Sequence, residues 1–539
     1  MENKVIVVST RPPKAPLSGG MAPAVSRACQ NFESVVWFAV ENAGGVKVGF
    51  NGQADSRSAG ECLDTADPIV TTMVEGMVVK TLQVNAGIWN SHYNLDSNEH
   101  KWPFTHEHFH RVIMLDATDL FGNFYVNDRI AQGIAAFLEE DSRTPIWIHD
   151  YHHFALPPFL RKHGVKNPIV FFNHVPMPDP EAVKSLPVEM QAHFITTLKG
   201  LLDCDAVMFQ TGETARRAMV LLGVSNPQHL GFYDRQVATA LKSGRPMRFL
   251  VGNYPISIDT PAIMHTAAHG QMSQVGKEIA QDMVADYIMI NFERCDYSKG
   301  ILQRLRAFKK LLDNHPEMKG KVQIVVGAEP TRGDIAAYRE YAQSVRDLSE
   351  SINSDPSSWC KGKPPVLLQY RNLSHDDVLL LMRNGENGQR KVCTVTSYTD
   401  GMNLVSKEFA AAQDPRNAGV LLLSSGTGAA AELYLQGRGA VVYDSRARDM
   451  SDSGGYENAC PPGDDSVNAI YHAMLESIRM PQEEANRRCA MMQSWLREYS
   501  LSKWADKHVE CFRELDQARE FGLVPSLRGG LLVPASLAI

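Results

Sequence analysis

Two basic residues of this chain, Arg294 and Lys299, lie just after a short apolar run. Residues 287–292 form that run, which predicts a buried strand, and residues 301–308 have the pattern of an amphipathic helix. Arg294 is therefore expected at a strand end and Lys299 near a helix start, where unpaired N–H groups also point outward. This combination suits an anion such as a phosphate or diphosphate. The alternative is an Arg–Lys pair in an ordinary surface loop.

A second strand–helix junction favours the anion site over the surface loop. It covers residues 399–408, about a hundred residues further along the chain, and follows a predicted strand at 392–395. Asp400, Asn403 and Glu408 supply polar side chains to this junction. Two such junctions predict a ligand site assembled from strand ends.

The N-terminus has the layout of a further ligand-binding turn. A short apolar strand at residues 5–8 leads to Arg11, and a glycine pair ending at Gly20 precedes a helical stretch at 24–32. Glycine lets a ligand approach the backbone, and a helix start offers N–H groups. A Gly-Gly pair alone more often marks an ordinary tight turn, but Arg11 at the strand end strengthens the binding interpretation.

Two neighbouring predicted strands also end in polar side chains. The strand at 145–149 is followed by Asp150, and the strand at 169–172 is followed by His174. The carboxyl ends of parallel strands border the crevice in which open α/β sheets bind ligands. Asp150 and His174 are therefore candidate site residues. The alternative is that they cap helices or satisfy buried backbone groups.

Aromatic and histidine residues between these strands are less specific. Trp89 lies in an aromatic stretch, and the usual role of a tryptophan is in a core. His106, His108 and His110 alternate, which places them on one face of a strand or only two of them on one face of a helix. No matching ligand residues lie nearby, so a metal site is not favoured.

The composition is that of a soluble globular protein. Of 539 residues, 44% are hydrophobic and 21% are charged, and the net charge of −7 argues against a general nucleic-acid binder. The nine cysteines are scattered without a C-x-x-C pair, which fits reduced thiols in the cytoplasm. No secretion signal or membrane-spanning run is evident. The sequence predicts small-molecule substrates, with no nucleic acid and no membrane as partners.

Strands and helices alternate along most of the chain. Further strands are predicted at 322–326, 366–369, 419–423 and 440–443, with helices between them. This alternation predicts an α/β fold of parallel sheets with right-handed crossovers. The predicted domains are 1–260, 261–500, and a C-terminal helix with an apolar tail at 501–539. The tail is expected either to pack on a partner subunit or to stay loose.

Several stretches together carry a resemblance to a known family. They read VVSTR (7–11), SGGM (18–21), WIHDYH (147–152), FNHVPMP (172–178), FQT (209–211), RCDYSKG (294–300), TRGD (331–334) and DGMNLVSKE (400–408). In this order and spacing, over about residues 1–515, the chain resembles retaining glycosyltransferase family 20. The stretches at 294–300 and 400–408 are the most specific of them.

The resemblance implies a GT-B glycosyltransferase fold, with two doubly wound Rossmann-like domains facing a central cleft. The first would bind the acceptor and the second the nucleotide-sugar donor. The family transfers glucose from a nucleotide-diphosphate glucose, UDP-glucose being expected here, to glucose 6-phosphate, giving trehalose 6-phosphate. It needs no metal ion and no cofactor. The leaving phosphate oxygen takes the acceptor proton, so no enzymic nucleophile is required. Members are often homo-oligomers.

The resemblance also implies roles for individual residues. The residues implied at the reacting centre are Asp150, His174, Arg294 and Lys299. Those implied for the donor are Gly20, Asp400, Gly401, Met402, Asn403, Leu404 and Glu408. Those implied for the acceptor are Arg11, Lys80, Trp89 and Arg332.

Four positions depart from the family pattern. Val40 stands where a tryptophan is usual, Lys80 near the place of a tyrosine, Thr399 in place of an arginine, and Ser257 in place of a glycine. The departures concern the acceptor more than the donor. There are two alternatives. One is a family member with another phosphorylated acceptor, such as glycerol 3-phosphate in glucosylglycerol-phosphate synthesis. The other is a catalytically silent sugar-phosphate-binding regulator. The sequence does not distinguish UDP, GDP and ADP as the donor nucleotide.

Overall fold

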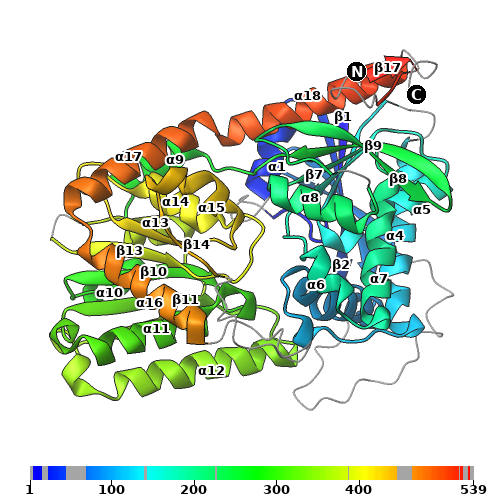
Figure 1. Cartoon of the computed structure of the whole chain (residues 1–539). Helices are drawn as coiled ribbons and strands as arrows, with labels where there is room; N and C mark the ends of the chain where they lie inside the picture. The colour runs from blue at the N-terminus through cyan, green and yellow to red at the C-terminus, as the bar shows by residue number, and fades with distance from the viewer. Residues whose placement is uncertain are drawn as a thin grey trace. The chain divides into compact units, whose positions relative to one another are not determined.

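The computed structural model describes residues 4–14, 22–43, 68–138, 143–224, 227–385, 388–445, 464–520, 523–525 and 532–534. The chain divides into two compact units. Unit 1 consists of Met1–Pro255 together with Trp504–Ile539, and unit 2 consists of Ile256–Lys503. Each unit is built around its own sheet (Figure 1).

Unit 1 contains a nine-stranded sheet in the order β3-β4-β2-β1-β5-β6-β7-β9-β8. Its strands are β1 (Lys4–Val8), β2 (Ser34–Asn42), β3 (Ile69–Val74), β4 (Met77–Val84), β5 (Ile146–His149), β6 (Ile169–Asn173), β7 (Ala206–Phe209), β8 (Arg235–Lys242) and β9 (Arg245–Asn253). Hairpins β3–β4 and β8–β9 are antiparallel and form the two edges, while all other neighbours are parallel. The chain reverses its direction of winding between β1 and β5, which pair directly.

The helices of unit 1 cover its sheet on both faces. They are α1 (Ala22–Cys29), α2 (Ala86–Trp89), α3 (Trp102–Thr105), α4 (Ala117–Leu138), α5 (Leu156–Lys162), α6 (Pro180–Lys184), α7 (Val188–Leu198), α8 (Gly212–Leu221) and α18 (Leu501–Glu520). A π-helix, η1 (Asn90–Lys101), and three 3₁₀ turns, η2 (Phe109–Arg111), η3 (Tyr151–His153) and η4 (Lys199–Asp203), complete the described helical segments.

Helix α18, from the far end of the chain, supplies part of the unit 1 core. Trp504 packs 5.5 Å from the ring of Trp147 on β5 and 5.4 Å from that of Phe172 on β6. Phe512 lies about two helical turns further along. Its ring also packs against that of Trp147, with 5.4 Å between the ring centres. Burying each such aromatic side chain contributes roughly 1.5–3 kcal/mol, which explains why this helix belongs to unit 1.

Unit 2 contains a six-stranded, fully parallel sheet in the order β12-β11-β10-β13-β14-β15. The strands are β10 (Tyr287–Arg294), β11 (Val322–Glu329), β12 (Val366–Gln369), β13 (Arg390–Val395), β14 (Val420–Ser424) and β15 (Val441–Tyr443). Numbered within the unit, the order is 3-2-1-4-5-6, that of a doubly wound dinucleotide-binding sheet. Its switch point lies between β10 and β13.

Helices flank both faces of the unit 2 sheet (Figure 1). Helices α11 (Ile301–Asn314), α12 (Ala336–Asn353) and α16 (Asp464–Arg479) pack together on one face. On the other face lie α9 (Thr260–His269), α10 (Gln274–Asp282), α13 (His375–Met382), α14 (Leu404–Ala412), α15 (Gly428–Leu433) and α17 (Gln482–Glu498). The 3₁₀ turns are η5 (Tyr297–Lys299), η6 (Pro316–Met318), η7 (Pro356–Ser358) and η8 (Leu435–Gly437).

The predicted α/β class with doubly wound parallel sheets is confirmed. Every strand that the sequence predicts from residue 287 onward is present, because those runs are apolar and buried on both faces. Sequence reasoning did not identify β8, whose partly exposed residues lack a continuous apolar run, nor the π-helix η1. In the apolar tail, β16 (Leu523–Pro525) and β17 (Leu532–Pro534) pair antiparallel.

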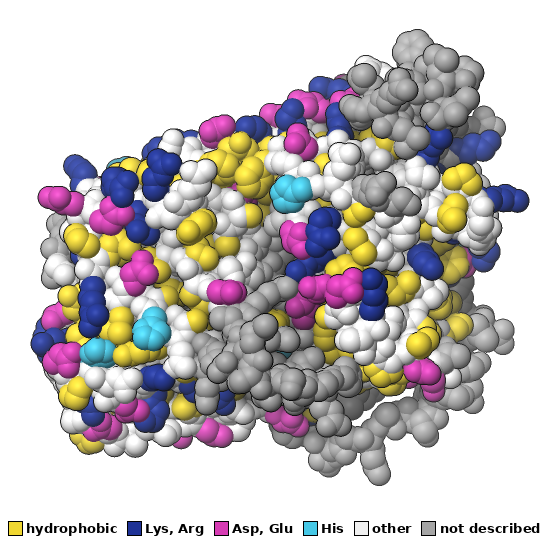
Figure 2. Space-filling model, viewed as in Figure 1, with side chains coloured by type: hydrophobic (Ala, Val, Ile, Leu, Met, Phe, Trp, Pro, Cys, Tyr) yellow, Lys and Arg dark blue, Asp and Glu magenta, His cyan; other side chains and the backbone are white. Residues whose placement is uncertain are grey.

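No helix among the described residues is long and apolar enough to cross a membrane. On the face shown in Figure 2, the coloured residues include Lys and Arg side chains interspersed with Asp and Glu, without a continuous basic stripe. The net charge of the whole chain is −7.

Candidate active site

The switch point of the unit 2 sheet brings the two sequence junctions together. Arg294 ends β10, Lys299 follows it on η5, and Asp400 comes after β13, the strand that pairs with β10. The ammonium of Lys299 lies 2.5 Å from the Asp400 carboxylate, and both side chains are only slightly exposed. Parallel strands that diverge in their connections leave a crevice at this point of the sheet. The structure therefore brings these strand ends together, as the sequence predicts.

Backbone bonds hold Asp400 in this position. Its N–H donates to the carbonyl of Gly426 at 3.0 Å, and its own carbonyl accepts from Gly428 at 3.1 Å. Gly426 packs so closely that a Cβ there would lie 1.9 Å from the carbonyl oxygen of Tyr398. The carboxylate of Asp400 also accepts from Asn403 at 3.3 Å. The loop after β13 is thus tied to the turn after β14.

Two N–H groups at the start of α11 already have an acceptor. The buried hydroxyl of Tyr341 accepts from the N–H of Ile301 at 2.9 Å and from that of Leu302 at 3.4 Å. Helix α14 differs. Its cap Asn403 accepts from Ser406 at 3.1 Å, and within the described residues no acceptor is assigned to the N–H of Leu404. The start of α14 thus carries an open N–H donor at this junction.

Gly300 allows the turn that carries Lys299 to approach β13. It has φ of 66°, and a Cβ at this position would lie 2.2 Å from the carbonyl oxygen of Thr396. The Thr396 hydroxyl in turn donates to the carbonyls of Lys299 and Gly300, each at 3.2 Å. Only glycine combines this left-handed conformation with such a close contact.

Of the other predicted donor residues, Glu408 has the clearest partner. Its carboxylate lies 3.1 Å from the ring Nε2 of His375 on α13. This hydrogen bond raises the pKa of His375, while partial burial acts in the opposite direction. Gly401 and Met402 are buried in the loop before α14, and the carbonyl of Met402 accepts from Ala429 at 2.9 Å. Thr399, which replaces an arginine of the family pattern, is 4% exposed.

Arg332 lies in the same unit as these residues, and its side chain is 5% exposed. Its guanidinium donates to the Asp296 carboxylate at 3.1 Å and to the hydroxyl of Tyr338. Asp296, which sequence reasoning did not single out, is itself 0% exposed. It stands two residues after Arg294, so the RCDYSKG motif contained the signal.

A second buried ion pair supports the end of β10. The Arg304 guanidinium on α11 lies 2.6 Å from the Glu293 carboxylate, with the two side chains 0% and 4% exposed. Arg304 also donates to the carbonyl of Thr394 on β13 at 2.9 Å. Burial raises the pKa of Glu293 even though Arg304 and Lys299 act against it. This pair links β10, α11 and β13. Sequence reasoning missed it because Arg304 lies on an apparently ordinary amphipathic helix.

The switch point of the unit 1 sheet carries a second group of candidates. Arg11, after β1, donates to the hydroxyl of Tyr93 at 2.6 Å, and its guanidinium lies 4.9 Å from the centre of that ring. Tyr93 stacks on Trp89 at 4.7 Å and lies parallel to His152 at 5.9 Å. Trp89 is thus part of an aromatic row beside an exposed arginine rather than a core residue. Such a row suits the apolar face of a sugar, with the arginine free to meet an anion.

The π-helix η1 presents Tyr93 in this row. Its side chains bond at a spacing of five residues. Ser97 donates to the carbonyl of His92 at 2.7 Å, Asn98 donates to that of Tyr93 at 2.6 Å, and Lys101 lies 2.7 Å from Asp96. Five-residue spacing matches the i→i+5 pattern of a π-helix, which is frequent at functional sites. Polar residues five positions apart, such as Asp96 and Lys101, were the sequence signal that could have predicted this π-helix.

Asp150 adopts a backbone conformation that L-residues rarely occupy. Its φ is 75° and its ψ is 161°, a region that costs of order 1–3 kcal/mol for a residue other than glycine. Its N–H donates to the carbonyl of Phe172 at 2.9 Å, and its carboxylate accepts from the N–H of His174 at 3.3 Å. Strain of this kind concentrates at functional sites. The structure therefore brings together the two residues predicted at the reacting centre of unit 1.

His174 belongs to a cluster of largely buried histidines. Its ring nitrogen lies 3.1 Å from that of His149, and Gln210 donates to its other nitrogen at 3.4 Å. Burial, with a smaller effect of the nearby His508, lowers the pKa of His174 to about 3. His174 is thus neutral near pH 7, when it acts as a hydrogen-bonding group and not as an acid.

Two predicted positions in unit 1 lie apart from these contacts. The Lys80 ammonium donates to the hydroxyl of Thr71 at 3.4 Å and lies 5.6 Å from the centre of the Phe137 ring on α4. No contact with Arg11 is recorded for it among the described residues. Val40 is 0% exposed and belongs to the core of β2. Gly20 lies outside the described residues.

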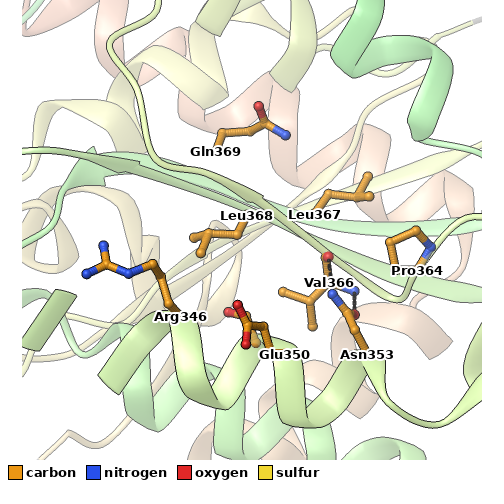
Figure 3. A pocket seen from close by; sticks show the side chains of 9 residues that line it. Arg346, Glu350, Asn353, Pro364, Val366, Leu367, Leu368 and Gln369 are labelled. Atoms are coloured by element: carbon orange, nitrogen blue, oxygen red, sulfur yellow. Dashed lines mark hydrogen bonds between the residues drawn. The ribbon is translucent and has the colours of Figure 1, made fainter. Parts of the chain in front are cut away.

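Within the described ranges, no group of three or more His, Cys, Asp or Glu side chains has metal-binding geometry. A hollow of about 360 Å³ lies elsewhere in unit 2, between α12 and the edge strand β12 (Figure 3). There the Asn353 amide bonds both backbone groups of Val366, at 2.9 and 3.0 Å. This bonding protects a sheet edge against further strand pairing.

The sequence matches a family model and many named proteins. The model of "Glycosyltransferase family 20" matches residues 36–441. A trehalose-6-phosphate synthase of Cronobacter sakazakii is 29% identical over 518 residues, which cover 95% of this chain and 96% of that protein. One from Escherichia coli is 32% identical over 435 residues, or 80% of this chain and 83% of that protein.

Solved structures agree with the sequence matches. The trehalose-6-phosphate enzyme of E. coli bound with UDP-2-fluoro glucose has a TM-score of 0.75 at 26% identity, covering 95% of this chain and 99% of that one. An α,α-trehalose-phosphate synthase (UDP-forming) from Burkholderia xenovorans in complex with glucose-6-phosphate has a TM-score of 0.75 at 27% identity, covering 95% and 100%.

These matches confirm the predicted GT-B fold and the predicted enzyme class, a glycosyltransferase. The family model spans about three quarters of the sequence and includes strands β10 to β14 of the unit 2 sheet in full. The chain belongs to glycosyltransferase family 20.

Proposed function

We propose that this chain transfers glucose from UDP-glucose to glucose 6-phosphate with retention of configuration, giving trehalose 6-phosphate. Its relatives with these substrates or their analogues bound are similar to it over 95% of its length. The observation that carries the proposal is the meeting of Arg294, Lys299 and Asp400 at the switch point of a doubly wound sheet. That is the place where such sheets bind nucleotides.

The charge at this switch point fits a nucleoside diphosphate. Arg294, Lys299 and Arg332 supply three cations, and Asp296 and Asp400 supply two anions, which leaves one net positive charge before any ligand binds. When the bond between glucose C1 and the diphosphate oxygen breaks, negative charge develops on that oxygen. Fixed cations stabilise this charge without reorganising, and each is worth roughly 3–4 kcal/mol. Arg294 and Lys299 take this role.

The remaining bonds change without an enzymic nucleophile. The acceptor hydroxyl oxygen bonds to C1 on the face that the diphosphate leaves, and its proton passes to the departing phosphate oxygen. Asp400 and the backbone of residues 401–404 hold the glucose hydroxyls, and Glu408 holds the ribose of the donor. His174, neutral near pH 7 because its pKa is about 3, and Asp150 contribute hydrogen bonds to the reacting sugars. Gly20 contributes close backbone approach.

Two arginines hold the acceptor in this proposal. Arg11 with its aromatic row of Trp89 and Tyr93 suits a sugar phosphate, and Arg332 supplies a second cation for the phosphate. Lys80 packs against Phe137 in this structure, so its part in acceptor binding requires a different rotamer.

A substrate panel tests the proposal. The purified chain is incubated with UDP-glucose and, in turn, glucose 6-phosphate, glycerol 3-phosphate and glucose, while UDP release and product mass are followed. A disaccharide phosphate formed with glucose 6-phosphate is the expected product. Transfer to glycerol 3-phosphate instead would contradict the acceptor assignment. No transfer from UDP-, GDP- or ADP-glucose would favour a silent sugar-phosphate-binding regulator.

The proposed reaction needs no metal ion. The cations that stabilise the leaving group belong to Arg294 and Lys299, which gives the diphosphate the charge that Mg²⁺ supplies in other phosphate-transfer sites. We expect turnover in the presence of excess EDTA to match turnover without it. A loss of activity that Mg²⁺ or Mn²⁺ restores would contradict this expectation.

We also propose that the chain works in the cytoplasm as a homo-oligomer, as expected for members of this family. The seven described cysteines are free thiols, as the reducing cytoplasm favours. Light scattering of the purified chain tests whether it forms a homo-oligomer. A monomeric mass across the working concentration range would contradict that state.

A further inference from the structure

Asp296 lies at the centre of the unit 2 cations. It follows Arg294 by two residues and precedes Lys299 by three, and its side chain is 0% exposed. A buried carboxylate is costly unless its oxygens are bonded and its charge is balanced. Here both carboxylate oxygens are bonded and the charge is balanced, but each oxygen has different partners.

One carboxylate oxygen of Asp296 builds the turn that carries Lys299. Oδ1 accepts from the N–H of Ser298 at 3.0 Å and from the hydroxyl of Ser298 at 2.9 Å. These bonds cap the 3₁₀ turn η5, and the N–H of Lys299 then donates to the Asp296 carbonyl at 3.0 Å. The position of Lys299 therefore depends on this oxygen.

The other oxygen of Asp296 holds Arg332. Oδ2 accepts from the Arg332 guanidinium at 3.1 Å, and the hydroxyl of Tyr338 accepts from the same nitrogen. Arg332 has φ of 46°, an uncommon conformation for a residue other than glycine. Its stacking over the Tyr338 ring, with the guanidinium carbon 5.1 Å from the ring centre, adds to its confinement.

The surrounding charges keep Asp296 ionised. Burial by itself raises the pKa of this carboxyl, but the charges of Arg332, Arg294 and Lys299 outweigh burial and hold the pKa at about 2. The carboxylate is thus a permanent anion at any working pH.

We propose that Asp296 is a positioning residue that aligns the donor cation Lys299 through one oxygen and the acceptor cation Arg332 through the other. The proposal rests on the proposed function for the roles of Lys299 and Arg332. It predicts that the two roles of Asp296 separate under substitution, because asparagine keeps a carbonyl oxygen for the turn but replaces the oxygen that holds Arg332 with an amide donor.

The chain contains a matched control for this turn. Asp355 also caps a 3₁₀ turn, η7, and its Oδ1 accepts from the N–H and hydroxyl of Ser357 at 3.0 and 2.7 Å. Its other oxygen pairs with Lys319 at 2.7 Å. The same Asp-x-Ser arrangement with a cation thus occurs in unit 2 at a position that binds no proposed substrate.

The experiment compares Asp296→Asn, Asp296→Ala, Asp355→Asn and Asp355→Ala. UDP affinity is measured by calorimetry, and kcat and KM for glucose 6-phosphate are measured at saturating UDP-glucose. For Asp296→Asn we expect the glucose 6-phosphate KM to rise at least tenfold, with a smaller change in kcat and no loss of UDP affinity. For Asp296→Ala we expect both affinities to fall at least tenfold. The Asp355 variants should change neither the UDP affinity nor the glucose 6-phosphate KM by more than about twofold.

Two results would overturn the proposal. One is an Asp296→Asn enzyme whose glucose 6-phosphate KM stays within twofold of the wild type, since Arg332 would then be held without the carboxylate. The other is an Asp296→Ala protein with unchanged UDP affinity. If Asp296→Ala does not fold, Ser298→Ala removes one bond to Oδ1 and should weaken UDP binding alone, and unchanged UDP binding would count against the proposal. A wild type that makes no disaccharide phosphate would contradict the proposed function instead, while UDP calorimetry would still decide the role of Oδ1.

Discussion

At the scale of single residues, charged pairs in unit 2 differ in whether they stay partly exposed or are fully buried. Two of the Lys–carboxylate pairs in unit 2 illustrate the difference, because their distances are similar but their exposures differ. Lys299 lies 2.5 Å from Asp400 with side chains 11% and 13% exposed, and Lys407 lies 2.6 Å from Glu432 with side chains 0% and 1% exposed. Lys407 also donates to the carbonyl of Ile256 at 2.7 Å. Both lysines belong to the sequence motifs, yet of the two only Lys299 keeps part of its side chain exposed.

Substituting these two lysines should have opposite consequences. Lys299→Ala, like Arg294→Ala, removes a preorganised cation, and we expect kcat to fall by about 10²–10³ with a smaller change in stability. Lys407→Met leaves a buried carboxylate uncompensated and should cost about 3–5 kcal/mol of unfolding free energy. Single-turnover assays and urea unfolding measure the two effects. A near-normal kcat for Arg294→Ala would contradict the diphosphate role.

The His375–Glu408 pair gives a residue-scale prediction about pH. The hydrogen bond to Glu408 is the main reason why the pKa of His375 is raised above its usual value. A raised folded pKa means that the stabilisation is fully present below the ordinary pKa near 6.5 and is lost as pH rises through the folded value. In Glu408→Gln, we expect the pKa of His375, measured by NMR titration, to return toward its ordinary value.

At the scale of elements, glycines decide how closely the site loops approach one another. Gly300 and Gly164 both have positive φ, of 66° and 79°. A Cβ on Gly300 would lie 2.2 Å from the Thr396 carbonyl oxygen, whereas a Cβ on Gly164 would meet nothing within 4 Å. The comparison separates the cost of the left-handed conformation from the cost of the contact.

We therefore expect Gly164→Ala to cost about 1–2 kcal/mol, the usual penalty of the left-handed region. Gly300→Ala should cost more, because the backbone of Thr396 must also move. It should in addition weaken UDP binding, since the turn that carries Lys299 shifts. Chemical unfolding and calorimetry of both variants test this expectation. Equal costs for the two substitutions, with unchanged UDP affinity, would show that the contact relaxes without strain.

At the scale of the whole molecule, the buried histidines make stability depend on pH. Burial lowers the pKa of His92 to about 4 and the pKa values of His174 and His508 to about 3. Burial also lowers the pKa values of His149 and His153 well below the usual range. All five lie in unit 1. A histidine that stays neutral when folded but takes up a proton when unfolded favours the unfolded chain once pH falls below about 6.5.

Unit 1 should therefore lose stability steadily between pH 6.5 and pH 5. Each such histidine contributes a slope of up to about 1.4 kcal/mol per pH unit. We expect His508→Gln to reduce the slope by up to about 1.4 kcal/mol per pH unit, because one fewer proton is taken up on unfolding. Unfolding followed by the tryptophans of unit 1 at several pH values measures the slope. An identical slope in His508→Gln and wild type would contradict the assignment.

The sequence by itself determined the elements and the main candidates. Apolar runs flanked by polar residues identified β10 and β13, and the residues that follow them, Arg294, Lys299 and Asp400, meet at the switch point as expected. This succeeded because strand length, burial on both faces and strand-end position are local properties that residue order records directly. The same locality explains why β8, with a partly exposed pattern, was not identified.

The tertiary structure alone decided which partners these residues have. Asp296 pairs with Arg332 across 36 positions, Tyr341 closes the start of α11 from 40 positions away, and α18 covers β5 through Trp504. Such pairings depend on how helices pack on a sheet, and neither periodicity nor spacing encodes that packing. The positive φ of Asp150 likewise follows from tertiary contacts, because local preference opposes it. The sequence thus determined where chemistry is possible, and packing between distant segments decided which groups position it.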